Sequence, residues 1–399
     1  MPNGIVTAPE KLFEEIAKKL DIPAKLYDEA EQNYNDLAKY LESTLQLPID
    51  VYVQGSFMLG TVIRPYRKQQ DKDYDVDLVC EFHSLSKEEC TPKQIKHLLG
   101  NALQKEPYNR ILDEEGKRCW TLNYPAKQGE LVGFHIDCLP CVPVLPNFST
   151  KIALTNKDKE TGDYNWAYSD PRAFKKWFDE RQKVAFMQLR DVQKRYIFEN
   201  SQSRVYNSIE EIPDRCVKTP LQKAIQILKR HRDVYFSSKH NEDCKPISMI
   251  ITVLSAHLYK QELTTYEALK TIVKGMARYA QLFEKYNERQ SDLITFDGET
   301  WEILSPVVDE NYAETWHENN HGKARAFFEW VNQLEKDLLL PIETGELKNY
   351  KFLVENSLRS DISSSFFDSL KLNSNGNRVI TAPTPTINAT NPINKPWLE

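Results

Sequence analysis

The chain has 399 residues, of which 40% are hydrophobic and 28% charged, and its formal net charge is −6. This length corresponds to roughly two to three domains, and the sequence has neither the run of ~18 apolar residues that a membrane span needs nor the hydrophobic region of a signal peptide. The acidic balance argues against constitutive binding of long nucleic acid, and seven cysteines without a framework pattern predict a reduced, cytoplasmic setting.

Hydrophobic periodicity predicts a mixed α+β chain. Residues 9–45 favour helix, with a break at 21–23 before a long amphipathic second helix. Residues from about 150 to 340 are expected to be mostly helical, and after residue 367 the sequence becomes polar and proline-rich, which predicts an extended, mobile tail. Four strands are expected to form one sheet, near residues 50–54, 74–82, 118–124 and 131–144.

Aspartates alternate along the strand expected at 74–82. Asp75 and Asp77 are two residues apart, so both would project from the same face of the sheet. Adjacent carboxylates repel each other unless a cation neutralises them, and oxygen-only ligands favour Mg²⁺. The alternatives are a solvated edge strand and a Ca²⁺ loop. The segment continues directly into an apolar strand at 78–82, without the glycine and glutamate that the Ca²⁺ loop of an EF-hand requires.

A third aspartate, Asp137, interrupts the apolar run at 131–144. An aspartate in such a run must be paired or metal-bound, because a lone buried charge is costly. Taken alone, a core carboxylate satisfied by hydrogen bonds is an equal alternative. Beside Asp75 and Asp77 the metal-ligand interpretation is favoured, since three aspartates on neighbouring strands could hold two ions roughly 3.5–4 Å apart.

A possible phosphate-binding turn follows the first expected strand, at Gln54, Gly55 and Ser56. A glycine lets the chain turn sharply, and a helix that begins there offers free backbone N–H groups to a phosphate. Together with the aspartates, this turn predicts a site for a nucleoside triphosphate and metal ions.

The order of these motifs is similar to that of a known superfamily. A Gly-Ser turn, an Asp-x-Asp strand and a lone later aspartate resemble the polymerase-β-like nucleotidyltransferases, and residues 54–56 (Gln-Gly-Ser) with 75–77 (Asp-Val-Asp) most resemble the cGAS/DncV-like group of bacteria. The resemblance implies a catalytic sheet that faces a helical lobe across a nucleotide cleft, with a long N-terminal spine helix. It also implies two Mg²⁺ ions, with Mn²⁺ as the alternative. The expected reaction joins nucleoside triphosphates, ATP among them, into a cyclic di- or trinucleotide that usually acts in antiphage defence.

Two positions in the expected helical lobe extend the resemblance. Lys229 borders the apolar face of a helix that begins near residue 220, whereas Lys223 and Arg230 fall on the opposite side and are expected to be exposed. The resemblance maps Lys229 onto the family's triphosphate-binding lysine. It maps Ser248, at the start of another apolar helix, onto the triphosphate-binding serine. The ordinary alternatives are a solvated border lysine and a helix-capping serine.

Several other polar positions keep two interpretations. Asn311, in a stretch at 304–316 that is similar to a loop of the family, could hydrogen-bond a base or hold the loop. Cys138 and Cys141 form a C-x-x-C without a second pair at zinc spacing, so buried core residues are favoured. His135 shares a strand face with the lone aspartate, where a ligand role is the alternative to packing.

The expected organisation places N-terminal helices and the catalytic sheet in residues 1–150, a helical lobe in 151–370 and a flexible tail in 371–399. Three functions stay open: a cyclic-oligonucleotide synthase, a polymerase-β-like transferase with an RNA, small-molecule or protein acceptor, and a non-catalytic nucleotide-binding module. The complete set of aspartates disfavours the module, and the acidic charge disfavours RNA. No membrane partner is expected, and a regulatory protein partner stays open.

Overall fold

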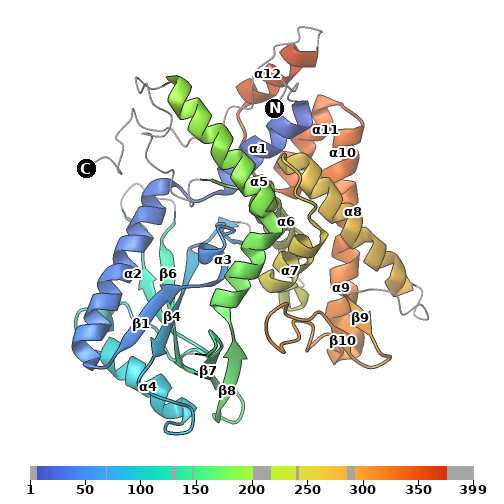
Figure 1. The fold of residues 1–399 in the computed structure, drawn as a ribbon. Helices are drawn as coiled ribbons and strands as arrows, with labels where there is room; N and C mark the ends of the chain where they lie inside the picture. The colour runs from blue at the N-terminus through green and yellow to red at the C-terminus, as the bar shows by residue number, and fades with distance from the viewer. Residues whose placement is uncertain are drawn as a thin grey trace.

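The structure of the protein, a computed structural model, describes residues 7–68, 70–127, 132–145, 148–200, 217–239, 242–284 and 293–374 (Figure 1). The extended tail predicted after residue 367 is instead helical as far as Ser374, the last residue of a helix that begins at Ser364, and from 375 onward it lies outside the described residues. Within the described residues, no helix is long and apolar enough to cross a membrane.

A six-stranded mixed sheet forms the first lobe, with the strand order β1-β4-β6-β7-β8 and with β5 paired to β6. Its central pair, β4 and β6, is parallel, and the other pairings are antiparallel. The strands are β1 (Ile49–Val53), β4 (Tyr74–Phe82), β5 (Trp120–Tyr124), β6 (Phe134–Pro143), β7 (Ile152–Lys157) and β8 (Tyr164–Ser169).

The four expected strands are confirmed to within a few residues, but the sheet continues past residue 150 into β7 and β8, where mostly helix was expected. Both strands are short, and neither has the length of apolar alternation that distinguishes a strand from a buried helix segment. Glycine at 162 was an available sequence signal for the turn between them. Gly162 adopts φ +77°, which glycine favours, and its N–H donates to the Asp158 carbonyl.

Helices α2 (Ala24–Leu45) and α4 (Pro92–Leu103) pack against one face of the sheet. Leu37 and Leu41 of α2 and Leu99 of α4 share a hydrophobic core with the inward side chains of β4. Helix α1 (Ala8–Leu20) instead contributes to the core of the helical lobe. The predicted break at 21–23 therefore separates a helix of each lobe.

The helical lobe is built around α6 (Pro220–Lys239), which contacts α1, α7, α8 and α9. Its other principal helices are α5 (Pro171–Asn200), α7 (Ser248–Leu258), α8 (Thr265–Glu284) and α9 (Glu318–Leu334). Shorter elements complete the chain: α3 (Gly55–Met58), the hairpins β2 (Tyr66–Arg67) with β3 (Gln70–Asp71) and β9 (Thr295–Phe296) with β10 (Trp301–Glu302), 3-10 turns at Tyr108–Arg110 and Glu242–Cys244, α10 (Leu340–Glu343), α11 (Leu347–Phe352), α12 (Ser364–Ser374), and π-helical turns at Glu335–Leu339 and Leu353–Ser357.

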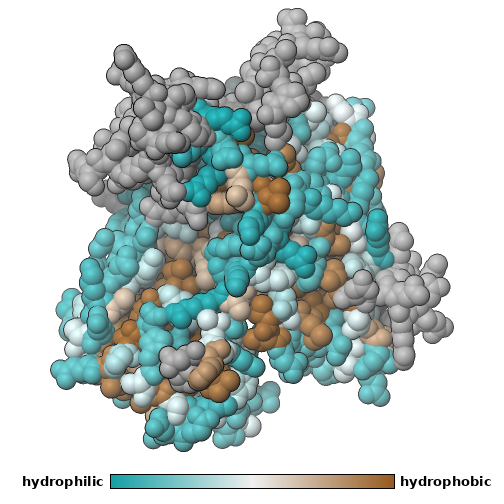
Figure 2. Space-filling view, in the orientation of Figure 1, coloured by the Kyte–Doolittle hydropathy of each residue, from teal (hydrophilic) through white to brown (hydrophobic). Residues whose placement is uncertain are grey.

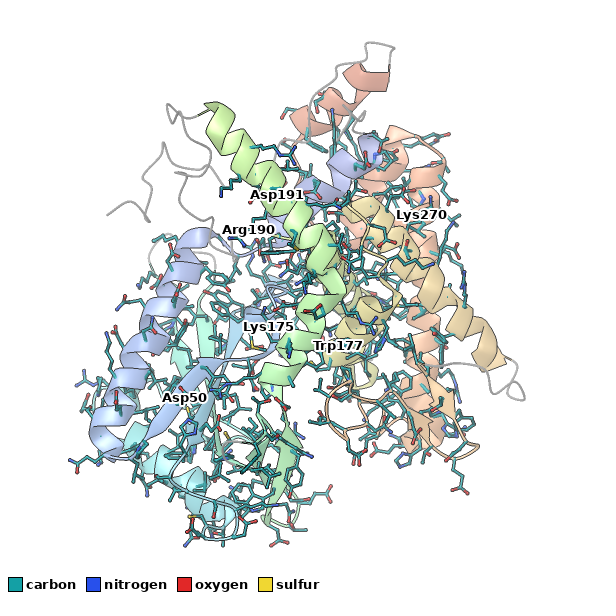
Figure 3. All side chains as sticks on the ribbon, viewed as in Figure 1. Asp50, Lys175, Trp177, Arg190, Asp191 and Lys270 are labelled. Atoms are coloured by element: carbon teal, nitrogen blue, oxygen red, sulfur yellow. The ribbon has the colours of Figure 1, made fainter. Side chains whose placement is uncertain are left out.

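Helix α5 joins the two lobes. Arg172 in its first turn forms an ion pair with Asp50 of β1, and the ring of Trp177 lies 5.1 Å from that of His257 in α7. Figure 3 labels Asp50 in the sheet lobe and Trp177 on α5. Figure 2 shows hydrophilic side chains along α5, with hydrophobic patches on either side of it. The helix thus spans the boundary at which a nucleotide cleft is expected.

Candidate active site

The three predicted aspartates lie on one face of the sheet. Asp77 of β4 is the direct neighbour of Asp137 in the parallel ladder with β6, and Asp75 lies two residues earlier, opposite His135. The intervening side chain of Val76 is buried on the other face. On the far side of β6, the Thr121 hydroxyl donates to Asp137 Oδ1 at 2.6 Å and fixes the orientation of that carboxylate.

The charges of these carboxylates are poorly compensated. Burial, followed by repulsion from Asp137 and Asp75, raises the pKa of Asp77 to about 7, although Lys229 opposes the shift. Burial and Asp137 also raise the pKa of Asp75, although its side chain reaches solvent, and here His135 opposes the shift. A divalent cation would relieve the repulsion that adds to the effect of burial in both shifts, so the donor set fits a metal site.

The Gly55 turn packs directly against Asp77. Gly55 has φ +60°, and a Cβ atom added to it would lie 2.4 Å from Asp77 Oδ2. The Gln54 N–H donates to the Asp77 carbonyl at 2.8 Å, and the Thr61 N–H donates to the Ser56 carbonyl at 2.9 Å. Glycine is therefore required here both by its φ angle and by the space that the carboxylate occupies.

Lys229 lies behind this turn and is only 4% exposed. Its ammonium donates to the Thr61 carbonyl at 3.1 Å. Burial and the neighbouring Arg232 lower the pKa of Lys229 to about 7, whereas Asp77 opposes the shift. The predicted lysine is thus close enough to the aspartates to interact with them, but the side chain is covered, not placed at an open border.

The expectation that Lys223 and Arg230 are exposed is wrong. Arg230 is buried, and its guanidinium donates to the Leu358 carbonyl at 2.7 Å and to Asp71 Oδ1 at 2.6 Å. Lys223 is half-buried and pairs with Glu14 at 2.7 Å. These partners come from segments distant in the sequence, so the periodicity of α6 could not reveal that its second face is covered.

Ser248 is the first residue of α7, whose N-cap is Ile247, so Ser248 is not the capping residue. It instead accepts a hydrogen bond from Arg232 Nη1 at 3.0 Å. Sequence reasoning did not identify this link between Ser248 and α6. The run of ionisable residues at 229–233 did indicate buried partners. Five consecutive residues point to every side of a helix, so some of these charges must face the protein interior.

Asn311 holds its own loop. Its Oδ1 accepts from the N–H groups of Ile303 and Ala313 at 3.0 and 2.9 Å, and its Nδ2 donates to the Trp301 carbonyl at 2.8 Å. Three hydrogen bonds therefore hold the amide within the hairpin region, and the loop alternative is favoured. Nucleotide binding by Asn311 stays a prediction.

The C-x-x-C cysteines are free and buried in the sheet, as the core interpretation predicted. His135 is half-buried, and its Nδ1 lies 2.7 Å from Asn123 Oδ1. Its Nε2 lies 3.7 Å from Asp73 Oδ2. The ring thus lies on the face of the sheet that carries the predicted aspartates, here called the catalytic face, between Asn123 and Asp73.

A second polar cluster lies at the other end of this face. The ligand atoms of Asp50, Glu81 and His83 all lie within 4.8 Å of one another. Among the described residues, the predicted aspartates are spread more widely and do not form such a group. Arg172 pairs with Asp50 and lies 3.9 Å from Glu81. This guanidinium already supplies one positive charge to the two carboxylates, so part of their repulsion is relieved without a metal ion.

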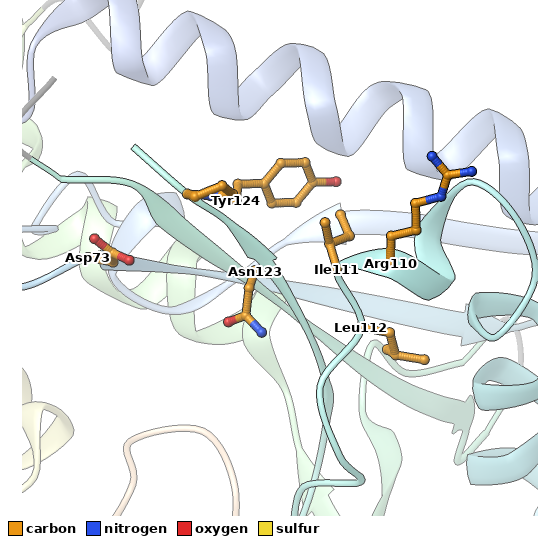
Figure 4. Close-up of a pocket in the computed structure, with 7 residues that line it drawn as sticks. Asp73, Arg110, Ile111, Leu112, Asn123 and Tyr124 are labelled. Atoms are coloured by element: carbon orange, nitrogen blue, oxygen red, sulfur yellow. The ribbon is translucent and has the colours of Figure 1, made fainter. Parts of the chain in front are cut away.

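A cavity of about 360 Å³ opens at the β5 edge of the sheet, and its lining does not include the three predicted aspartates. Asp73 lies at one end and Arg110 at the other, with the Tyr124 ring between them and Asn123 on the side of the catalytic face (Figure 4). This volume is within the range of small-molecule pockets, ~300–1,000 Å³.

Residues 49–141, from β1 through the aspartate-bearing part of β6, match the family model described as "Cyclic GMP-AMP synthase DncV-like, nucleotidyltransferase domain". The chain therefore contains a region similar to DncV-like nucleotidyltransferase domains. Among curated proteins, it is 26% identical over 338 residues to a c-di-GMP synthase of Roseivirga ehrenbergii, which covers 83% of this chain and 79% of that protein.

Solved structures share the fold of this chain. The CD-NTase CdnG of Bradyrhizobium diazoefficiens, solved with GTP, has a TM-score of 0.64 at 17% identity, covering 92% of this chain and 99% of that one. DncV of Escherichia coli, in its 3'-deoxy GTP bound form, has a TM-score of 0.52 at 17% identity, covering 90% and 88%. The α+β fold predicted from the motifs is confirmed, and the match to the family model supports the predicted resemblance.

Proposed function

We propose that this protein joins nucleoside triphosphates into a cyclic di- or trinucleotide. The observation that carries the proposal is the pairing of Asp77 with Asp137 across β4 and β6, inside the region that matches the family model. The curated relative is named a c-di-GMP synthase, which favours GTP as one substrate, and ATP is a further candidate. A role in antiphage defence stays the expectation that the family resemblance implies.

We assign the divalent metal ions, two Mg²⁺ or alternatively Mn²⁺, to Asp75, Asp77 and Asp137. When bound, such ions activate an attacking hydroxyl and stabilise a leaving pyrophosphate. The protein's own part is to hold the carboxylates in place: Thr121 orients Asp137, and the Gly55 backbone limits the movement of Asp77.

The triphosphate is assigned to the groups that surround this face. Lys229 and Ser248 are the proposed phosphate-binding side chains, and the turn at residues 54–56 is proposed to bind the nucleotide through its backbone and through Gln54 and Ser56. Lys229 supports this assignment because its charge already interacts with Asp77.

The test is incubation of the purified protein with all four labelled nucleoside triphosphates and Mg²⁺, followed by phosphatase treatment and mass analysis. We expect phosphatase-resistant cyclic products from the wild type and none from Asp77→Ala, which should remain folded. Linear products or label on an added RNA would favour the transferase alternative. An Asp75→Ala, Asp77→Ala double variant with unchanged product yield would contradict the proposal entirely.

A further inference from the structure

Five consecutive ionisable residues of α6 are all buried, with exposed fractions between 1% and 7%: Lys229, Arg230, His231, Arg232 and Asp233. Burying a charge costs several kcal/mol unless it finds partners. The first three have partners on separate elements, since Lys229 donates to Thr61, Arg230 to Leu358 and Asp71, and His231 bonds to Asp337. The last two residues of the run bind each other.

Asp233 collects contacts from three segments of the chain. Its Oδ1 accepts from Arg232 Nε at 3.0 Å and Nη2 at 2.8 Å, and it lies 3.3 Å from Lys245 Nζ. Its Oδ2 accepts from the Tyr66 N–H at 3.3 Å. Burial raises the pKa of Asp233, but Arg232 and Lys245 outweigh burial and hold it below the ordinary value. The carboxylate is therefore ionised at neutral pH.

These contacts converge on the proposed triphosphate site. Arg232 also donates through Nη1 to Ser248 Oγ at 3.0 Å and to the Pro246 carbonyl at 3.1 Å. Lys245 belongs to the same segment before α7, and its side chain is 18% exposed. Tyr66 begins the β2–β3 hairpin that leads into the aspartate strand β4.

We propose that Asp233 is a positioning residue of the triphosphate site, which fixes Arg232 against Ser248 and holds Lys245 as an additional phosphate-binding cation. Before the nucleotide binds, the acid keeps two mutually repelling cations together. The phosphates then meet a preformed cationic group. Because folding has already ordered these side chains, binding loses no further side-chain entropy at them. This inference rests on the proposed function for the location of the triphosphate.

The experiment measures equilibrium binding of non-hydrolysable analogues of GTP and ATP, and of the nucleosides guanosine and adenosine. For Asp233→Asn we expect triphosphate affinity to fall by about tenfold or more, because hydrogen bonds to charged groups are weakened, while nucleoside affinity stays within about twofold. Asp233→Glu should restore part of the triphosphate affinity.

Asp337→Asn is the matched control, because Asp337 also pairs with a buried α6 side chain, His231 at 3.0 Å. It should lower the melting temperature without changing triphosphate affinity. Equal loss of affinity in both variants, or an Asp233→Asn affinity within twofold of wild type, would overturn the proposal.

Lys245→Met keeps the inference testable should Asp233→Asn fail to fold. It should weaken triphosphate binding by about three- to tenfold, in keeping with one charged contact, and unchanged affinity would overturn the inference. The assay does not depend on any product, so a linear product would count only against cyclic synthesis. A wild type that binds no triphosphate would count against the proposed function itself.

Discussion

At the level of single residues, the site depends on a contact that only glycine can make. Gly55 presents its backbone to Asp77, and any larger residue would place a carbon atom where the carboxylate oxygen lies. The two aspartates of β4 are held on the same face by the period of the strand, and Asp137 is the neighbour of Asp77 in the ladder. Single substitutions can separate these contributions.

Gly55→Ala should reduce turnover by about 100-fold, because a displacement of a reacting group by roughly 1 Å has an effect of that size. The added Cβ would lie 2.4 Å from Asp77 Oδ2 and must push the carboxylate away. Gly345→Ala is the control, since Gly345 also has a positive φ, +68°, but nothing lies within 4 Å of an added Cβ. It should lose about 1 kcal/mol of stability and keep full activity. Equal activity in the two variants would count against the assignment of Asp77.

Asp77→Asn should stabilise the metal-free protein at pH 8. The folded pKa is about 7, whereas an unfolded aspartate has a pKa of about 3.9. Between these values the folded chain keeps a proton that the unfolded chain has lost, so stability falls as pH rises through that window. The gain in the variant should therefore shrink toward pH 4, as thermal melts in EDTA would measure.

Asp50→Asn serves as the comparison for this effect, because Asp50 already pairs with Arg172 and its loss should give no gain at pH 8. Addition of Mg²⁺ should stabilise the wild type and leave Asp77→Asn nearly unchanged. If Asp77→Asn were less stable than wild type at pH 8 in EDTA, the carboxylate would not be under repulsion.

The positions of Asp75, Asp77 and Asp137 could be predicted from the sequence because strand geometry alone decides which face a side chain occupies. The partners of Ser248 and Asn311 could not be predicted in this way. Ser248 bonds to Arg232, whose position depends on how α6 and α7 meet, whereas Asn311 bonds to backbone groups of its own hairpin region, whose turn geometry the residue pattern does not specify. Local pattern carries no information on such contacts.

At the level of elements, the prediction succeeded where one segment shows its own period. The break between α1 and α2 and the four expected strands follow from local sequence. β7 and β8 were missed because their strand character comes from pairing with each other and with β6. The second face of α6 was misjudged for the same reason, since its cover comes from Asp71 and Leu358.

The loop after β10 provides a test at this scale. Asn311→Ala removes three hydrogen bonds within the loop and should cost about 1–3 kcal/mol of stability, with the KM for nucleoside triphosphate unchanged within about twofold. Asn356→Ala, which removes one exposed hydrogen bond to the Phe352 carbonyl, should change neither quantity. A KM raised several-fold at an unaltered melting temperature would instead support the base-binding alternative.

At the level of the whole molecule, α6 connects regions that are far apart in the sequence. Arg230 donates to the Leu358 and Arg359 carbonyls and to Asp71 of the β2–β3 hairpin, and its guanidinium lies 4.6 Å from the centre of the Tyr66 ring. One side chain therefore joins the aspartate lobe, the helical lobe and the segment before α12. Such a link depends on the final packing of three regions and cannot be read from any one of them.

Arg230→Met should lower the free energy of unfolding by about 3–5 kcal/mol, because it leaves buried carbonyls and a carboxylate without their donor. Hydrogen exchange should rise together in β2–β3 and around Leu358, since Arg230 contacts both. Lys223→Met is the control on the same helix, where the half-exposed pair with Glu14 should contribute less than about 1 kcal/mol. A double-mutant cycle with Asp71→Asn, measured by urea unfolding, isolates the one charged pair. Exchange that rises in only one of the two segments would show that Arg230 does not couple the lobes.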